Sequence, residues 1–533
     1  MATLRASAFV QGGCFMRFRL PVVATATLAL IAPVVPATAA PPPEPLVFGA
    51  CPADIAQPFP ALTCATLQVP VDYRKPAGAT LDLLVTKHAA KAPSKRLGAL
   101  FVNPGGPGGG GAAYAGTLTR PDATGFTRLQ PAVLDAYDVI GFDPRGVSHS
   151  SPISCADPSH FPTPQPDPDA PASRDPLWKL WGDYADGCGA KAGALLPHLG
   201  TDNVARDMDN IRAALGEQKL NYVGFSYGTY LGSVYSELFR ERVGRMILDG
   251  NIDPTPRDVW YQASLAQAPA FEKRFTSYLG WVAKYDTVYH LGTAVDQVRA
   301  NWDKTLAEFR RTPHGVVGAY ELLTTAGGVM FSESNWIAFT SALSSYVVGG
   351  DDSALVDFAA ADTSAASERF NAIFNAVICV DADWPSTRAR YERDAARLAK
   401  VSQFTWVNVW AGGGACLDWP VPNHTPVHVS GKGLPGILMF NTVGDPSTPY
   451  AGALKLHKVL RSSVLVTERD SGKHCVFSNS RALVNTAAND IGTKYLLTGE
   501  LPPADTSVPG HALPVPTPAT LKAPITKVPL LER

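Results

Sequence analysis

The sequence has no excess of charge of either sign. Its 533 residues include 46 Lys and Arg against 47 Asp and Glu, which leaves a formal net charge of −1. A protein that binds nucleic acid needs a basic surface to neutralise phosphates, so we expect no nucleic-acid partner. The hydrophobic share of 46% also excludes a chain that is disordered throughout.

Long apolar runs are absent beyond the N-terminus. A membrane-spanning helix needs about 18 or more consecutive apolar residues, and no later segment supplies them. Residues 1–39 have the pattern of a signal peptide, with Arg17 and Arg19 before an apolar stretch at 20–35 and small residues at 37–39. We therefore expect a secreted, extracellular protein with no stable membrane insertion after signal cleavage.

Closely spaced Cys-x-x-Cys pairs are missing, which argues against a zinc ribbon; no metal and no cofactor are expected. Cys14 lies before the apolar stretch and would leave with the signal peptide. In an oxidising compartment we expect sequence neighbours to pair and Cys475 to stay free, although the sequence alone does not fix the connectivity. The expected disulfides are Cys51–Cys64, Cys155–Cys188 and Cys379–Cys416.

Short apolar runs alternate with helical patterns in the two outer parts of the mature chain. The helical pattern is clearest at 203–215, where apolar side chains recur on one face. Buried strands are expected at 97–103, 137–142, 221–225, 245–249, 436–441 and 463–467. This alternation predicts an α/β fold, with a mostly parallel sheet and helices on both faces.

Between these parts the sequence is rich in amphipathic helical stretches and aromatic residues. The middle segment therefore has the character of a helical cap inserted into the sheet domain and closed over the active site. The expected organisation is a signal peptide at 1–39, core at 40–253, cap at 254–422, core at 423–500 and an irregular Pro-rich tail at 501–533.

A G-x-S-x-G pentapeptide at 224–228 places Ser226 between an expected strand and an expected helix. On such a tight turn the serine hydroxyl is exposed and the flanking glycines relieve crowding. The backbone N–H of Tyr227, at the start of the helix, can then point at a developing oxyanion. This context predicts a nucleophilic serine, whereas the pentapeptide alone is also compatible with an ordinary glycine-rich turn.

A nucleophilic serine needs a base and an acid, which in this architecture follow it in the order acid, then histidine. Asp445 and His474 each come shortly after one of the late strands. They are the candidate acid and base, with a turn-forming aspartate and a surface histidine as the alternatives. Cys475 adjoins His474, and we interpret it as a buried free thiol rather than a nucleophile.

The glycine-rich stretch NPGGPG at 103–108 follows another expected strand. Glycines allow close backbone approach, so the N–H of Gly106 is the second candidate oxyanion donor. A dinucleotide-binding motif is rejected, because Pro107 removes a backbone donor and no acidic residue ends a following strand. In DPRG at 143–146 we expect Asp143 and Arg145 to form a structural pair.

Taken together, these motifs resemble the secreted tripeptidyl aminopeptidases of actinobacteria, which are related to the proline iminopeptidases of the α/β-hydrolase superfamily. The stretches that carry the resemblance are VPVDY at 69–73, NPGGPG at 103–108, DPRG at 143–146, GFSYGTY at 224–230, DPSTP at 445–449 and GKHC at 472–475. The resemblance implies Ser226 as nucleophile, Asp445 as acid and His474 as base, with Gly106 and Tyr227 as oxyanion donors. Pro104 stands where proline iminopeptidases have a histidine, which argues against proline-specific cleavage.

The expected function is a secreted serine hydrolase that acts on a peptide or a small ester. The favoured activity is an aminopeptidase that releases tripeptides from free N-termini; the alternatives are a carboxylesterase with the same triad and a catalytically idle binding protein. An exopeptidase has to recognise the substrate's α-ammonium group, most simply with a carboxylate in a partly desolvated pocket. Asp381 is the favoured candidate, with Asp383 and Asp418 as alternatives and a structural carboxylate as the competing interpretation.

Overall fold

A mostly parallel sheet forms the centre of the part of the chain that the structure describes. The computed structural model describes residues 44–405 and 413–518, all within one compact unit, Pro42–Arg533. In these residues the sheet has nine strands in the order β1-β2-β4-β3-β5-β6-β7-β8-β9. The signal peptide expected at 1–39 lies outside the described residues.

The strand directions divide the sheet at β4. β1 pairs antiparallel with β2, and β2 pairs antiparallel with β4; every later pair is parallel. The strands are β1 (Thr63–Pro70), β2 (Thr80–His88), β3 (Gly98–Asn103), β4 (Tyr137–Phe142), β5 (Leu220–Phe225), β6 (Val243–Asp249), β7 (Ile437–Thr442), β8 (Ser463–Glu468) and β9 (Thr506–Val508). The parallel strands all end at one edge, where loops can gather functional side chains.

Helices cover both faces of the sheet, so the predicted fold class is confirmed. On β3, Leu100 and Phe101 are both fully buried, Leu100 in one apolar layer and Phe101 in the other. One face is covered by α2 (Gly111–Thr119), α3 (Pro131–Ala136) and α17 (Thr486–Thr498). The other is covered by α5 (Thr201–Ala214), α6 (Tyr227–Leu238) and α16 (Tyr450–Val459).

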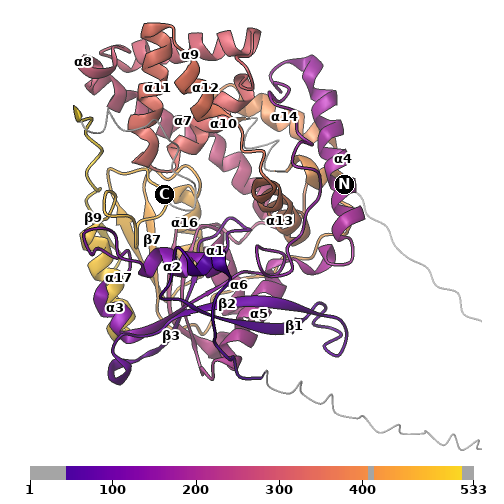
Figure 1. Ribbon diagram of the computed structural model, residues 1–533, viewed down its shortest axis with the longest axis vertical. Helices are drawn as coiled ribbons and strands as arrows, with labels where there is room; N and C mark the ends of the chain where they lie inside the picture. Colours follow the sequence, from indigo (N-terminus) through magenta and orange to yellow (C-terminus); the bar gives the residue numbers. More distant parts are fainter. Residues whose placement is uncertain (1–43, 406–412, 519–533) are drawn as a thin grey trace, which may run out of the picture. The chain divides into compact units, whose positions relative to one another are not determined.

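A run of helices separates β6 from β7 in the chain (Figure 1). Most of these helices share an apolar core of their own, which includes Phe275, Trp302 and Phe339. Its members are α7 (Val259–Lys284), α8 (Asp286–Tyr289), α9 (Val295–Arg311), α10 (Ala319–Met330), α11 (Trp336–Gly349), α12 (Ser353–Ala359), α13 (Ala365–Asp381) and α14 (Arg388–Leu398). We call α7–α14 the helical region. The domain boundaries expected from the sequence stay a prediction.

One helix from the N-terminal half joins this region. Helix α4 (Arg174–Ala192) lies in the segment that the sequence assigned to the core. Its Trp178 packs edge-on against Tyr391 of α14, with ring centroids 5.4 Å apart. α4 thus adds to the helices around α14 (Figure 1). No local sequence pattern predicts this contact.

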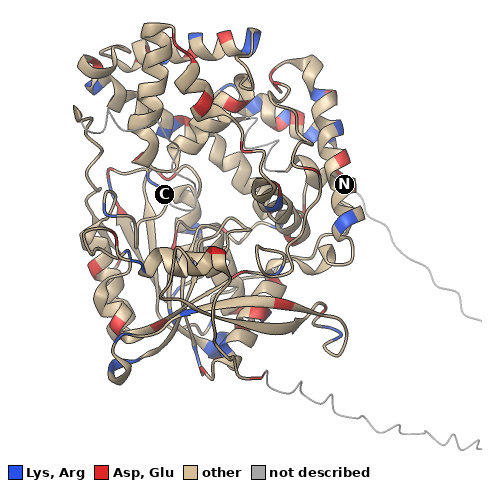
Figure 2. Cartoon of the chain, viewed as in Figure 1, with Lys and Arg blue, Asp and Glu red and all other residues tan. Residues whose placement is uncertain are grey.

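The Pro-rich tail is less irregular than expected, because residues 506–508 add β9 to the edge of the sheet. Three disulfides join Cys51 to Cys64, Cys155 to Cys188 and Cys379 to Cys416, and in the described residues Cys475 is the free cysteine. No described helix is both long and apolar enough to cross a membrane. Acidic and basic residues are interspersed along the chain (Figure 2).

Candidate active site

Ser226 occupies the tight turn between β5 and α6. Its φ of 56° is positive, which is costly for a residue with a side chain and clusters at functional sites. The turn is held by the Ser226 N–H, which donates to the carbonyl of Asp249 at 2.9 Å. A Cβ on Gly224 would lie 2.5 Å from the Gly228 carbonyl oxygen, so the glycine is required there. The strand–turn–helix context is the one the sequence predicts.

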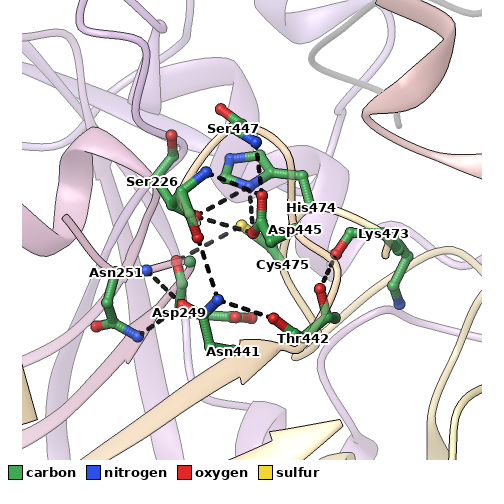
Figure 3. A network of polar contacts seen from close by, with 12 residues as sticks. Ser226, Asp249, Asn251, Asn441, Thr442, Asp445, Ser447, Lys473, His474 and Cys475 are labelled. Atoms are coloured by element: carbon green, nitrogen blue, oxygen red, sulfur yellow. Dashed lines mark hydrogen bonds and ion pairs between the residues drawn. The ribbon is translucent and has the colours of Figure 1, made fainter. Parts of the chain in front are cut away.

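His474 and Asp445 meet beside this turn (Figure 3). Nδ1 of His474 lies 2.8 Å from Oδ2 of Asp445, whose side chain is fully buried. The other carboxylate oxygen accepts the backbone N–H groups of Ser447 and Thr448 at 2.8 and 2.9 Å. The Thr448 hydroxyl donates to Oδ2 at 2.8 Å. The aspartate is therefore fixed in position by four contacts from three residues.

These contacts set the protonation of the histidine. Burial lowers the pKa of His474, but the charge of Asp445 and its hydrogen bond outweigh burial, so that the pKa is raised above its ordinary value. Because Nδ1 faces Asp445, Nε2 is the nitrogen left to exchange a proton. Within the described chain no hydrogen bond joins Nε2 to the Ser226 hydroxyl, a contact that often tightens only when substrate is bound.

The glycine-rich stretch passes directly in front of Ser226. A Cβ on Gly105 would lie 2.9 Å from Cβ of Ser226 and 3.1 Å from the Tyr227 nitrogen. Gly106 has a φ of 112°, so this backbone path needs glycine. Tyr227 is the first residue of α6, where the N–H has no acceptor inside the helix. Gly105, the neighbour of Gly106, thus lies close to Tyr227. The pairing of Gly106 and Tyr227 as oxyanion donors stays a prediction.

Asp381 lies at the end of α13 and is nearly fully buried. Its carboxylate accepts the N–H of Thr201 at 2.6 Å and the Thr201 hydroxyl at 2.5 Å. Thr201 Oγ is in turn 2.7 Å from the hydroxyl of Tyr227. Burial raises the pKa of Asp381 to about 7. Its predicted role in substrate binding stays a prediction.

Asp381 also faces a cavity of about 310 Å³. Polar side chains that line this cavity include Asp202, Arg206, Tyr230 and His424. Ser226, Asp445 and His474 are not among its lining residues in the described chain. Asp381 is connected to the serine turn through Thr201, whose hydroxyl contacts that of Tyr227.

The expected pairing of Asp143 with Arg145 is wrong. Arg145 is fully buried and pairs with Asp207 at 2.6 Å, while Asp143 accepts the N–H of Ala112 at 3.1 Å and contacts His149. Both residues still shape the loop after β4, but through separate partners. Asp207 is on α5, more than 60 residues away in the sequence, so short-range spacing could not reveal the pair.

Two residues touch the site without having been predicted, and a third forms an unpredicted buried contact outside it. Asp249 ends β6 and contacts the loop that carries His474. Phe331 accepts the His474 N–H at its carbonyl oxygen, 2.7 Å away. His511, in the tail, is buried against Glu468 of β8. Only Asp249 had a local signal, since it is an acidic residue at the end of an apolar strand.

The sheet, the serine turn and the His–Asp pair define a serine hydrolase of the α/β class. Residues 98–477 match the model of the alpha/beta hydrolase fold family. The chain is 43% identical over 478 residues to a tripeptidyl aminopeptidase of Streptomyces lividans, covering 87% of each chain. It is 32% identical over 467 residues to serine protease Hip1 of Mycobacterium tuberculosis, covering 83% of this chain and 86% of that one.

A carboxylesterase B of Mycobacterium tuberculosis is also 32% identical, over 463 residues that cover 83% of this chain and 85% of that one. The protein belongs to the α/β-hydrolase family, in the branch that contains the tripeptidyl aminopeptidases. The family expected from the motifs is thereby confirmed.

Proposed function

We propose that the protein is a secreted serine aminopeptidase that releases tripeptides from free N-termini through an acyl-enzyme on Ser226. The observation that carries the proposal is the buried His474–Asp445 pair beside the serine turn, in a chain 43% identical to a tripeptidyl aminopeptidase along 87% of its length. The three disulfides support export to an oxidising compartment.

In the proposed mechanism, Oγ of Ser226 attacks the carbonyl carbon of the third residue while Nε2 of His474 takes the hydroxyl proton. Asp445 stabilises the imidazolium, and the N–H groups of Gly106 and Tyr227 donate to the oxyanion. The C–N bond then breaks, and His474 passes its proton to the leaving amine. Water, deprotonated by His474, attacks the acyl-enzyme. The bond between the acyl carbon and Oγ then breaks, the tripeptide leaves, and His474 returns the proton to Oγ of Ser226.

Recognition of the free N-terminus is assigned to a carboxylate, for which Asp381 is the candidate. In the described residues no cationic side chain forms an ion pair with Asp381, whereas the alternative Asp383 already pairs with Arg257 at 3.2 Å. A buried carboxylate without a fixed cation is suited to an ammonium group. The helical region, proposed as the cap, would then restrict entry to chain ends.

This assignment predicts that Asp381→Asn reduces the preference for free over N-acetylated tripeptide anilides by about 10- to 100-fold, because a buried charge partner contributes about 1.5–3 kcal/mol. The measurement is kcat/KM for both substrates, with Asp383→Asn as the matched control. An unchanged preference in Asp381→Asn, or the loss in Asp383→Asn instead, would remove Asp381 from this role.

A carboxylesterase is the second candidate, favoured by the relative of that name. The two activities separate on matched substrates: a tripeptide anilide with a free amine, the same anilide N-acetylated, and a simple acyl ester. The aminopeptidase hydrolyses the free peptide far faster than the blocked one. Equal rates on both peptides, or faster turnover of the ester than of either, would favour the carboxylesterase.

A further inference from the structure

Asp249 lies where the three candidate catalytic segments meet. It ends β6, whose neighbours in the sheet are β5, which leads into Ser226, and β7, which leads toward Asp445. Its side chain is fully buried. The mechanism above does not use this carboxylate. Burying a carboxylate costs free energy, which raises the question of what this one does.

The backbone and the side chain of Asp249 hold two different segments. The carbonyl oxygen accepts the N–H of Ser226 at 2.9 Å. Oδ2 of the carboxylate accepts the N–H groups of Val476 and Phe477, both at 2.7 Å. One residue thus ties the serine turn to the loop that carries His474.

The next two residues extend this connection. A Cβ on Gly250 would lie 3.0 Å from Cε1 of His474 and 3.1 Å from Oγ1 of Thr448, so the strand end packs directly against the base. The Asn251 N–H donates to Oδ1 of Asn441 at 2.7 Å, and Nδ2 of Asn441 donates to the Thr448 carbonyl at 3.2 Å. Thr448 is one of the residues that bind Asp445.

We propose that Asp249 is a positioning residue for the reaction, which holds the His474 loop in register with Ser226 through its two backbone hydrogen bonds. The inference rests on the function proposed above. Asp249 acts through the loop, because Nδ1 of His474 is bound by Asp445. A displacement of about 1 Å between nucleophile and base costs about 100-fold in rate, so such an anchor contributes to kcat.

The charge of Asp249 gives the proposal a second, independent readout. Its electrostatic neighbours are Lys473, His474 and Cys475 on the loop and Tyr114 on α2. Burial raises the pKa of Asp249 to about 7, against the lowering effect of its backbone hydrogen bonds. Its negative charge helps to raise the pKa of His474. Removal of that charge should lower the pKa of the base.

Two substitutions separate geometry from charge. Asp249→Asn keeps an oxygen that can accept both N–H groups, and its amide nitrogen replaces Oδ1, which has no hydrogen-bond partner among the described residues. Asp249→Ala removes the acceptor altogether. The matched control is Glu368→Ala, since Glu368 is another buried carboxylate whose Oε1 accepts two successive backbone N–H groups, of Cys155 at 2.7 Å and Ala156 at 3.0 Å.

The experiment measures kcat, KM and the pH profile of kcat/KM on a tripeptide anilide, with thermal melting as the check on folding. We expect Asp249→Ala to lose about 100-fold in kcat with KM changed less than about threefold. Asp249→Asn should retain kcat within about tenfold and move the acid limb of the profile to lower pH. Glu368→Ala should lower the melting temperature and leave kcat unchanged.

A folded Asp249→Ala enzyme with the kcat of the wild type would overturn the proposal, and so would an Asp249→Asn enzyme as slow as Asp249→Ala. If Asp249→Ala does not fold, Asp249→Asn decides: retained kcat with a lowered acid limb supports the proposal, and an unmoved limb contradicts it. Ser226→Ala, assayed in parallel, distinguishes failure of this inference from failure of the proposed function. Full activity in Ser226→Ala would refute the proposed function itself.

Discussion

The sheet and the helical region hold their buried carboxylates in different ways. In the sheet, Asp445 and Asp249 are each bound by two backbone N–H groups. Where the helical region meets the sheet, Glu333 is held by Arg274 and His511. Backbone donors keep their protons at every pH, whereas an imidazole does not. The donors that hold Asp445 and Asp249 therefore cannot be lost by deprotonation, whereas the imidazole donor at the contact between the two regions can.

That contact runs through three segments of the chain. Oε2 of Glu333, between α10 and α11, lies 3.2 Å from Nε2 of His511, and Nδ1 of His511 lies 2.9 Å from Oε1 of Glu468 at the end of β8. Burial lowers the pKa of His511, but its bonds to Glu333 and Glu468 outweigh burial and raise it. The tail histidine thus bridges a carboxylate from each region.

The largest expected effect is the loss of kcat on substitution of a carboxylate in the sheet. Asp445→Asn removes the charge that stabilises the His474 imidazolium, and we expect kcat to fall about 10³- to 10⁴-fold while the fold persists. Steady-state kinetics on a tripeptide anilide measure this, with Asp183→Asn, a half-exposed partner of Lys179, as the control. A loss of less than tenfold would mean that another group orients His474.

A change at the contact between the regions should act on stability instead. A histidine with a raised folded-state pKa stabilises the protein fully below its unfolded pKa of about 6.5, and this stabilisation is lost as pH rises through the folded value. We expect His511→Gln to cost about 3 kcal/mol of unfolding free energy at pH 6, because it breaks a buried pair. The cost should shrink as the pH is raised.

Urea unfolding of the wild type and His511→Gln between pH 5.5 and 9 gives the two curves. His314→Gln is the control, since His314 pairs with the half-exposed Asp352 and such surface pairs contribute only about 0–1 kcal/mol. If the unfolding free energies of wild type and His511→Gln change in parallel with pH, the protonation of His511 is not coupled to folding. The proposed difference in pH dependence between the two regions would then be wrong.

The smallest effect concerns the disulfides of the two regions. Cys379–Cys416 links residues 37 apart and starts in α13, whereas Cys51–Cys64 links residues 13 apart beside the sheet. In the chain-entropy model the longer loop contributes about 1 kcal/mol more. Pairwise replacement by Ala, followed by thermal melting, compares them. A greater loss from the short link would show that native contacts, rather than loop length, determine the contribution of each bond.

The parts of the site that the sequence revealed are those encoded locally. Ser226 lies between an apolar run and a helical pattern, and Asp445 and His474 each follow a strand, so short windows suffice to find them. Arg145 pairs with Asp207, α4 packs on α14, and His511 reaches Glu468 from a Pro-rich tail. These contacts join distant segments, and a single sequence holds no pattern that pairs them.

The most direct measurement of the proposed activity is the mass of the enzyme during turnover. The protein is mixed with a free-amine tripeptide ester, quenched in acid within milliseconds to seconds, and analysed by mass spectrometry. We predict an adduct of one tripeptidyl group, located on Ser226 by peptide mapping, absent in Ser226→Ala and scarce when the substrate is N-acetylated. An adduct on Cys475, or equal acylation by the blocked substrate, would contradict a serine aminopeptidase.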